Sequence, residues 1–127
     1  MEIQTDLERL SRVRQSLSEL AQEVVRLMPI FMDRLPMIKG SVYKQSRKCG
    51  KPNCRCRTGK LHASMILSRS EGGKTRLLSI PEGRLKELQI LTRRYRRFRS
   101  ARAHLRQTHR KMLLLIDTLE AARRQAP

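Results

Sequence analysis

The fold is decided by residues 88–119, LQILTRRYRRFRSARAHLRQTHRKMLLLIDTL. Apolar and aromatic side chains recur there at intervals of seven residues, at Leu91, Phe98, Leu105, Met112 and Leu119. The positions between them in the same stripe are Leu88, Tyr95, Arg102, His109 and Ile116, so the stripe is apolar at both ends and polar in the middle. This repeat predicts a long amphipathic helix. The helix is expected to start near Pro81, because proline suits the first helical turn.

A second amphipathic helix is predicted over residues 1–35. Thr5 and Glu8 have the spacing of a capping box. Apolar residues then follow at intervals of three and four: Leu7, Leu10, Val13, Leu17, Leu20, Val24, Leu27 and Phe31. Pro29 is expected to kink or end this helix. Neither helix can bury its stripe alone, so we expect an antiparallel, coiled-coil-like helical hairpin, or a homo-oligomer formed through the helices.

The residues between the two helices are predicted to form a small β element. Segments with a period of two occur at Ser41–Arg47, Ser64–Arg69 and Thr75–Ile80, and the turn-forming residues Ser70–Lys74 join the last two. A sheet of two or three strands has little core of its own. It therefore needs a staple or a supporting helix.

A length of 127 residues allows one ordinary domain and excludes a large enzyme with separate cofactor and substrate modules. We expect a mainly α fold with a small β element, as a single domain with three parts: the N-terminal helix (1–35), a cysteine-stapled β-hairpin insert (36–80) and the basic C-terminal helix (81–124). The apolar runs are far shorter than the roughly 20 residues that span a bilayer. The first residues are acidic where a secretory signal would be basic, so we expect a cytoplasmic protein without membrane contact and with reduced cysteines.

The charge balance points to a polyanionic partner. Lys and Arg number 29 against 11 Asp and Glu, which gives a net charge of +18 at pH 7. Such an excess repels itself in a compact chain unless a polyanion such as DNA or RNA screens it. The chain has no Trp, two Tyr and two Phe. Binding led by phosphate contacts is therefore favoured over stacking on single-stranded bases.

Two basic segments are the candidate nucleic-acid-binding surfaces. Residues 93–111 contain no acidic residue, and the phosphate contacts expected there are Arg93, Arg94, Arg96, Arg97, Arg99, Arg106 and Arg110. The second segment flanks the cysteines and offers Lys44, Arg47, Lys48, Lys51, Arg55 and Arg57. The alternatives are an ordinary solvated helix face and binding to anionic lipid or to an acidic protein. Two separate basic elements favour an extended polyanion, and the choice between DNA and RNA stays open.

A cluster of cysteine and histidine residues lies inside the β element. Cys49, Cys54, Cys56 and His62 have the ligand types and the number of a closed tetrahedral zinc site. Cys54 and Cys56 would point to the same side of an extended backbone, so both could reach one ion. Their spacing is irregular for a zinc motif, which leaves two alternatives open: three reduced thiols in a basic loop, or a catalytic cysteine with His62 as its base.

These segments resemble a family of short basic prokaryotic proteins of unknown function. The resemblance covers roughly residues 38–105 and rests on Gly40-Ser41-Val42-Tyr43, the run from Arg47 to Cys56, His62, Gly72-Gly73-Lys74-Thr75-Arg76, Ile80-Pro81 and Tyr95-Arg96-Arg97-Phe98. Members of the family usually carry Gly-Pro and aromatic residues just after the histidine, where this chain has Ala63–Leu67. The resemblance implies an accessory role near mobile elements, with a transposase or another nucleic-acid enzyme as a partner.

The acidic residues outside the first helix are scattered, without a pairing that would hold two catalytic metal ions. We therefore expect a non-enzymatic nucleic-acid-binding protein. A protein-interaction scaffold, which recruits an enzyme or binds an acidic protein, is the alternative.

Overall fold

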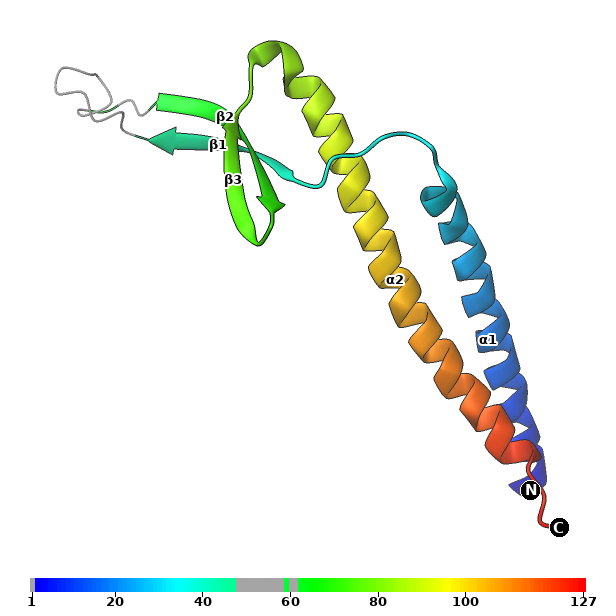
Figure 1. Ribbon diagram of the computed structural model, residues 1–127. Helices are drawn as coiled ribbons and strands as arrows, with labels where there is room; N and C mark the ends of the chain where they lie inside the picture. Colours follow the sequence, from blue (N-terminus) through cyan, green and yellow to red (C-terminus); the bar gives the residue numbers. More distant parts are fainter. Residues whose placement is uncertain (1, 48–58, 60–61) are drawn as a thin grey trace. The chain divides into compact units, whose positions relative to one another are not determined.

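The computed structural model describes residues 2–47, 59 and 62–127. The elements follow in the order α1 (Glu2–Met32), β1 (Ser41–Arg47), β2 (His62–Glu71), β3 (Lys74–Ser79), the 3-10 turn η2 (Glu82–Arg84) and α2 (Leu85–Arg123), as Figure 1 shows. The expected mainly helical fold with a small sheet and a long C-terminal helix is confirmed. Across the described residues, no helix has an apolar stretch of the length that a bilayer requires.

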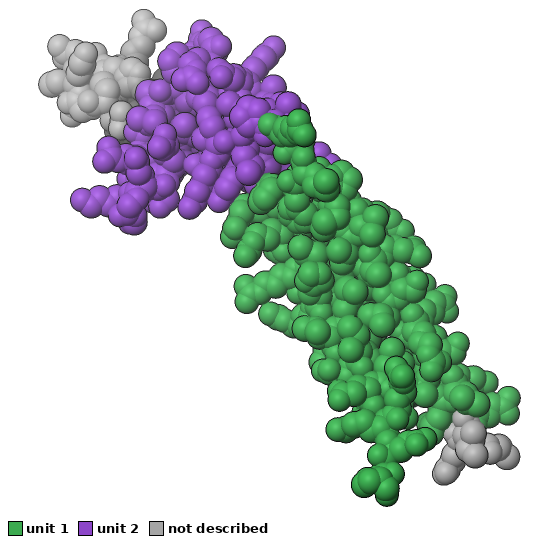
Figure 2. All heavy atoms as spheres, turned by 45° about the vertical axis from the view of Figure 1, so that its right-hand side comes forward, with its two compact units in different colours: residues 1–34, 98–127 green, residues 35–97 purple. Residues whose placement is uncertain are grey.

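The chain divides into two compact units, which Figure 2 distinguishes by colour. Unit 1 consists of residues 1–34 and 98–127, and unit 2 of residues 35–97. In unit 1, α1 runs antiparallel to the C-terminal part of α2 (Figure 1). The rings of Phe31 and Phe98 meet edge to face, with centroids 5.3 Å apart. Further along, His104 Nε2 lies 3.7 Å from Glu23 Oε1.

The α1 side of this helix pair follows the expected stripe with one exception. Seven residues of the expected stripe are half-buried: Leu10, Val13, Leu17, Leu20, Val24, Leu27 and Phe31. Leu7 belongs to the expected stripe, but its exposed fraction is 61%. The helix also continues through Pro29 to Met32 rather than ending there. A proline within a helix removes one backbone donor, and the donors of the residues after it remain available.

The α2 side of the pair corrects the expected stripe. Phe98, Leu105 and Met112 are half-buried as expected, but Arg102, His109 and Ile116 are exposed. Their places are taken by the residues one position earlier, Ala101, Thr108 and Leu115. Both sets of residues lie beside the seven-residue repeat formed by Phe98, Leu105 and Met112. The helix turns Ala101 inward and Arg102 outward because burying an unpaired guanidinium costs far more than burying an alanine. The same helical phase brings Thr108 and Leu115, seven and fourteen residues later, to the buried side.

Unit 2 contains an antiparallel sheet with the strand order β1-β2-β3. β1 has the bounds that the sequence predicted, and its Tyr43 pairs with Ile66 of β2. β2 and β3 are joined by Gly72 and Gly73 alone, with φ angles of 58° and 78°. Two successive positive φ angles are typical of the tight hairpin turns in which glycine is favoured.

The N-terminal part of α2 supports this sheet. Among the described residues of unit 2, the buried apolar ones are Ile66, Leu67 and Leu88. Thr92 is fully buried, and its hydroxyl donates to the carbonyl oxygen of Leu88 at 2.8 Å, so this polar group is satisfied inside the helix. The segment before β1 is held to α2 by a hydrogen bond of 3.0 Å from the Ile38 amide to the Leu91 carbonyl.

Candidate nucleic-acid interface

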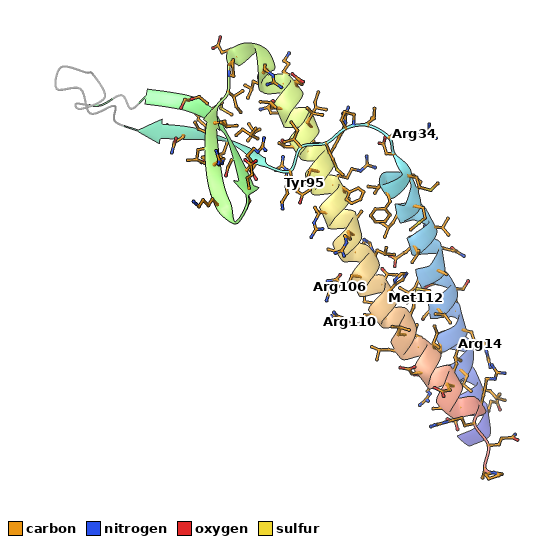
Figure 3. All side chains as sticks on the ribbon, in the orientation of Figure 1. Arg14, Arg34, Tyr95, Arg106, Arg110 and Met112 are labelled. Carbon is orange, nitrogen blue, oxygen red and sulfur yellow. The ribbon has the colours of Figure 1, made fainter. Side chains whose placement is uncertain are left out.

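Four arginines form one surface of α2 within unit 1. Arg99, Arg102, Arg106 and Arg110 follow one another at intervals of three, four and four residues and are all exposed. At 100° per residue they lie within an arc of about 80°. Figure 3 shows Arg106 and Arg110 pointing away from α1, whereas Met112 points towards it. We call these four residues the arginine stripe.

Arg102 is the member of the arginine stripe that is absent from the phosphate contacts expected from the sequence. The seven-residue repeat places it among the polar middle positions of the amphipathic stripe, whereas the structure exposes it. The signal that could have found it is the spacing of the arginines themselves, which places Arg102 on one helical face with Arg99 and Arg106.

The arginine stripe has no carboxylate partner among the described residues. Ion pairs elsewhere in the described residues join Arg69 and Arg76 to Glu71, Arg84 to Glu87, and His104 to Glu23. Like charges three or four residues apart on a helix repel one another by a few tenths of a kcal/mol per pair. A bound polyanion would relieve this repulsion in the stripe.

Unit 2 carries a further group of α2 arginines, which do not all have the same environment. Arg93, Arg96 and Arg97 are exposed. Arg94 is half-buried, and its Nη1 donates a hydrogen bond of 3.1 Å to the carbonyl oxygen of Pro36. Arg94 therefore holds the segment before β1 against α2, and part of its donor capacity is already used.

Two residues of the second basic surface, Lys44 and Arg47, lie within the described part of the chain. Lys44 is exposed in β1, and Arg47 is the last residue of that strand. Lys48, Lys51, Arg55 and Arg57 lie outside the described residues, as do Cys49, Cys54 and Cys56. His62 begins β2, where it pairs with Arg47 of β1. The chain therefore leaves the sheet and returns to it at adjacent positions, with the three cysteines in the intervening segment.

No group of three or more His, Cys, Asp or Glu side chains that could hold a metal ion occurs within the described residues, which exclude the three cysteines.

Comparison with protein families gives a match over residues 4–90. This range includes α1 from Gln4 onward, the sheet and the cysteine segment, and it ends before the arginines of α2. No curated protein and no solved structure matches the chain. Because the match covers well over half of the sequence, the chain belongs to the family described as Domain of unknown function (DUF6788).

Proposed function

We propose that this protein is a non-enzymatic nucleic-acid-binding protein that grips phosphates through arginine side chains. Its role is that of an accessory factor of a mobile element or of other DNA- or RNA-processing machinery, with a transposase or similar enzyme as a partner. The observation that carries this proposal is the arginine stripe, which is exposed and has no carboxylate partner among the described residues.

The dimensions of the stripe suit an extended polyanion. The helical rise from Arg99 to Arg110 amounts to about 16 Å. One strand of duplex DNA rises about 3.4 Å per phosphate, so this length spans about five phosphates. Arginine suits such contacts because its planar fork can donate two hydrogen bonds to one phosphate.

The salt dependence of binding tests the proposal. The logarithm of the affinity for duplex DNA should fall linearly with the logarithm of the salt concentration, with a slope of about −0.9 per neutralised phosphate. Replacing Arg99 and Arg102 by Gln should reduce the magnitude of that slope by up to about 1.8 for all sequences alike. A separate variant with Gln at Arg93, Arg96 and Arg97 tests the arginines of unit 2. Fluorescence anisotropy over a salt series supplies the slopes.

The matched control replaces Arg9 and Arg12 by Gln. These exposed arginines also lie on a helix of unit 1, but α1 mixes them with acidic residues such as Asp6 and Glu8. We expect the control to keep the slope of the unchanged protein. Equal slopes for the control and for the Arg99 and Arg102 variant would remove the stripe from the interface, and binding without salt dependence would refute the proposal.

A protein-interaction scaffold is the second candidate function. It is supported by the exposed apolar residues of the edge strand β3, since Leu77 and Leu78 have exposed fractions of 51% and 47%. Edge strands are common sites of strand addition by a partner chain. Purified protein that carries no nucleic acid and shifts neither DNA nor RNA in gels would favour the scaffold.

We also propose that Cys49, Cys54, Cys56 and His62 bind one zinc ion. The pairing of Arg47 with His62 supports this, because it brings both ends of the cysteine-containing segment together. Three thiolates and one imidazole would complete a tetrahedral site of the structural kind, which stabilises small domains. The basic residues around the cysteines would balance the negative charge of the thiolates.

A further inference from the structure

The face of α2 that carries the arginine stripe changes its chemistry beyond Arg110. It continues with Leu113, Asp117 and Glu120, all exposed. Together with Arg106 and Arg110, these residues have spacings of four, three, four and three, and at 100° per residue they lie within an arc of about 80°. The exposed fraction of Leu113 is 60%, and that of the neighbouring Ile116 is 45%.

The order of these residues is self-complementary. Two positive charges precede a leucine, and two negative charges follow it at nearly equal distances. A second helix of the same sequence, laid antiparallel across this face, therefore brings opposite charges together on both sides of the leucine. Closed pairs of identical chains commonly use such an isologous arrangement, in which residue i meets residue j and j meets i.

We propose that two copies of this chain associate through this face of α2, antiparallel and around a twofold axis at Leu113. Arg106 of each copy then faces Glu120 of the second copy, and Arg110 faces Asp117. The two Leu113 side chains meet at the centre, with Ile116 beside them. This inference does not rest on the proposed function, because it concerns the chain free of nucleic acid.

Burial within unit 1 supports a second copy as the occupant. Among the described residues of this unit, only Ala101 and Thr108 are buried. Leu113 and Ile116 of α2 are among the large apolar side chains that this helix pair leaves exposed, and exposed apolar surface is typical of association sites. The charge pattern selects the orientation, since a parallel copy in register would place Arg106 and Arg110 against their own counterparts, and like charges in contact repel.

The contact is short, which sets its expected strength. The rise from Arg106 to Glu120 is about 21 Å, and a strip one helix wide and of this length buries less than the roughly 1,600 Å² of a standard interface. We expect a dimer that dissociates on dilution. The pairing leaves Arg99 and Arg102 of each copy outside the charge pairs, and the two Arg99 positions lie about 42 Å apart along the helices.

Charge reversal followed by mixing tests the pairing. One variant carries Arg106→Glu and Arg110→Glu, and another carries Asp117→Arg and Glu120→Arg. Each variant alone sets like charges against each other in the dimer, so its dissociation constant should rise about tenfold or more. The equimolar mixture restores opposite charges at every pair and should restore the dimer. Sedimentation velocity of full-length chains, washed free of nucleic acid in high salt, measures the mass against 14.9 kDa for one copy.

Leu113→Glu should likewise abolish the dimer, and Leu114→Glu is its matched control. Leu114 is similarly exposed, at 64%, but is turned by 100° to another side of the helix, so its variant should stay dimeric. Circular dichroism of each variant verifies that the helices are retained. An unchanged chain that is monomeric at all concentrations overturns the proposal. So does a mixture that stays monomeric, or a greater effect of Leu114→Glu than of Leu113→Glu.

Discussion

At the scale of single residues, Gly40 shows how closely unit 2 is packed at the start of its sheet. A Cβ atom on Gly40 would lie 2.8 Å from the carbonyl oxygen of Ser68 and 3.1 Å from Cδ1 of Leu67. Real Cβ atoms do not approach a backbone oxygen so closely, and Ser68 is fixed by its pairing with Ser41. Glycine is therefore required here by space.

We predict that Gly40→Ala destabilises the protein by about 1–3 kcal/mol, the usual range for overpacking. Urea unfolding followed by circular dichroism measures this change. Gly83→Ala is the matched control, because a Cβ atom at Gly83 has no neighbour within 4 Å. That variant should stay within about 0.5 kcal/mol of the unchanged protein. Equal effects of the two substitutions would contradict the role given to Gly40.

At the scale of elements, the buried side of α2 in unit 1 depends on a choice between adjacent residues. Ala101 has an exposed fraction of 5%, whereas Arg102 is exposed. Both flank the stripe that contains Phe98 and Leu105, and helical periodicity permits either. In the structure Ala101 is the buried one, since it carries no charge that burial would remove from water. The same orientation of the helix exposes Arg102 and places it in the arginine stripe.

We predict that Ala101→Arg lowers the free energy of unfolding by about 2–4 kcal/mol, because it places a large, charged side chain against α1. Arg102→Ala should change it by no more than about 0.5 kcal/mol, as is usual for an exposed position. Thermal and urea unfolding of both variants give the comparison. A greater loss of stability for Arg102→Ala than for Ala101→Arg would mean that Arg102, and not Ala101, faces α1.

At the scale of the whole molecule, the two units have different reasons to need a partner or a ligand. Unit 1 leaves apolar side chains such as Leu113 and Ile116 exposed, which the proposed second copy of the chain would cover. The buried apolar residues of unit 2 among the described ones are Ile66, Leu67 and Leu88. A small sheet with so few buried residues gains little stability from its core. The proposed zinc ion would supply the missing stabilisation.

We predict one equivalent of zinc per chain, lost on Cys54→Ser. Metal removal by a chelator should lower the melting temperature of the sheet and leave the helical signal of unit 1 largely intact, because folding and metal binding are coupled only where the ligands lie. Elemental analysis of untagged protein and circular dichroism in the far ultraviolet measure both effects. Folded protein without metal, or an unchanged melting curve after chelation, would refute the site.

The sequence by itself determined the elements of this protein. The seven-residue repeat predicted α2, and the period-two segments predicted all three strands, with β1 at its observed bounds. The density of arginine predicted the charged face. These features are local, since helical and strand periodicity and charge are properties of neighbouring residues.

Only the tertiary structure decided which of these residues are buried, which are exposed and which form hydrogen bonds within the chain. It turned Ala101 and Thr108 inward, left Arg102 and Leu7 outside, and tied Arg94 to Pro36. Helical periodicity allows either of two adjacent residues, three or four positions after a stripe residue, to face the partner helix. Ala101 and Arg102 are such a pair, and only the packing of a second element distinguishes them. The cost of burying a charge then selects between them, and that cost arises only when the packed partner is present.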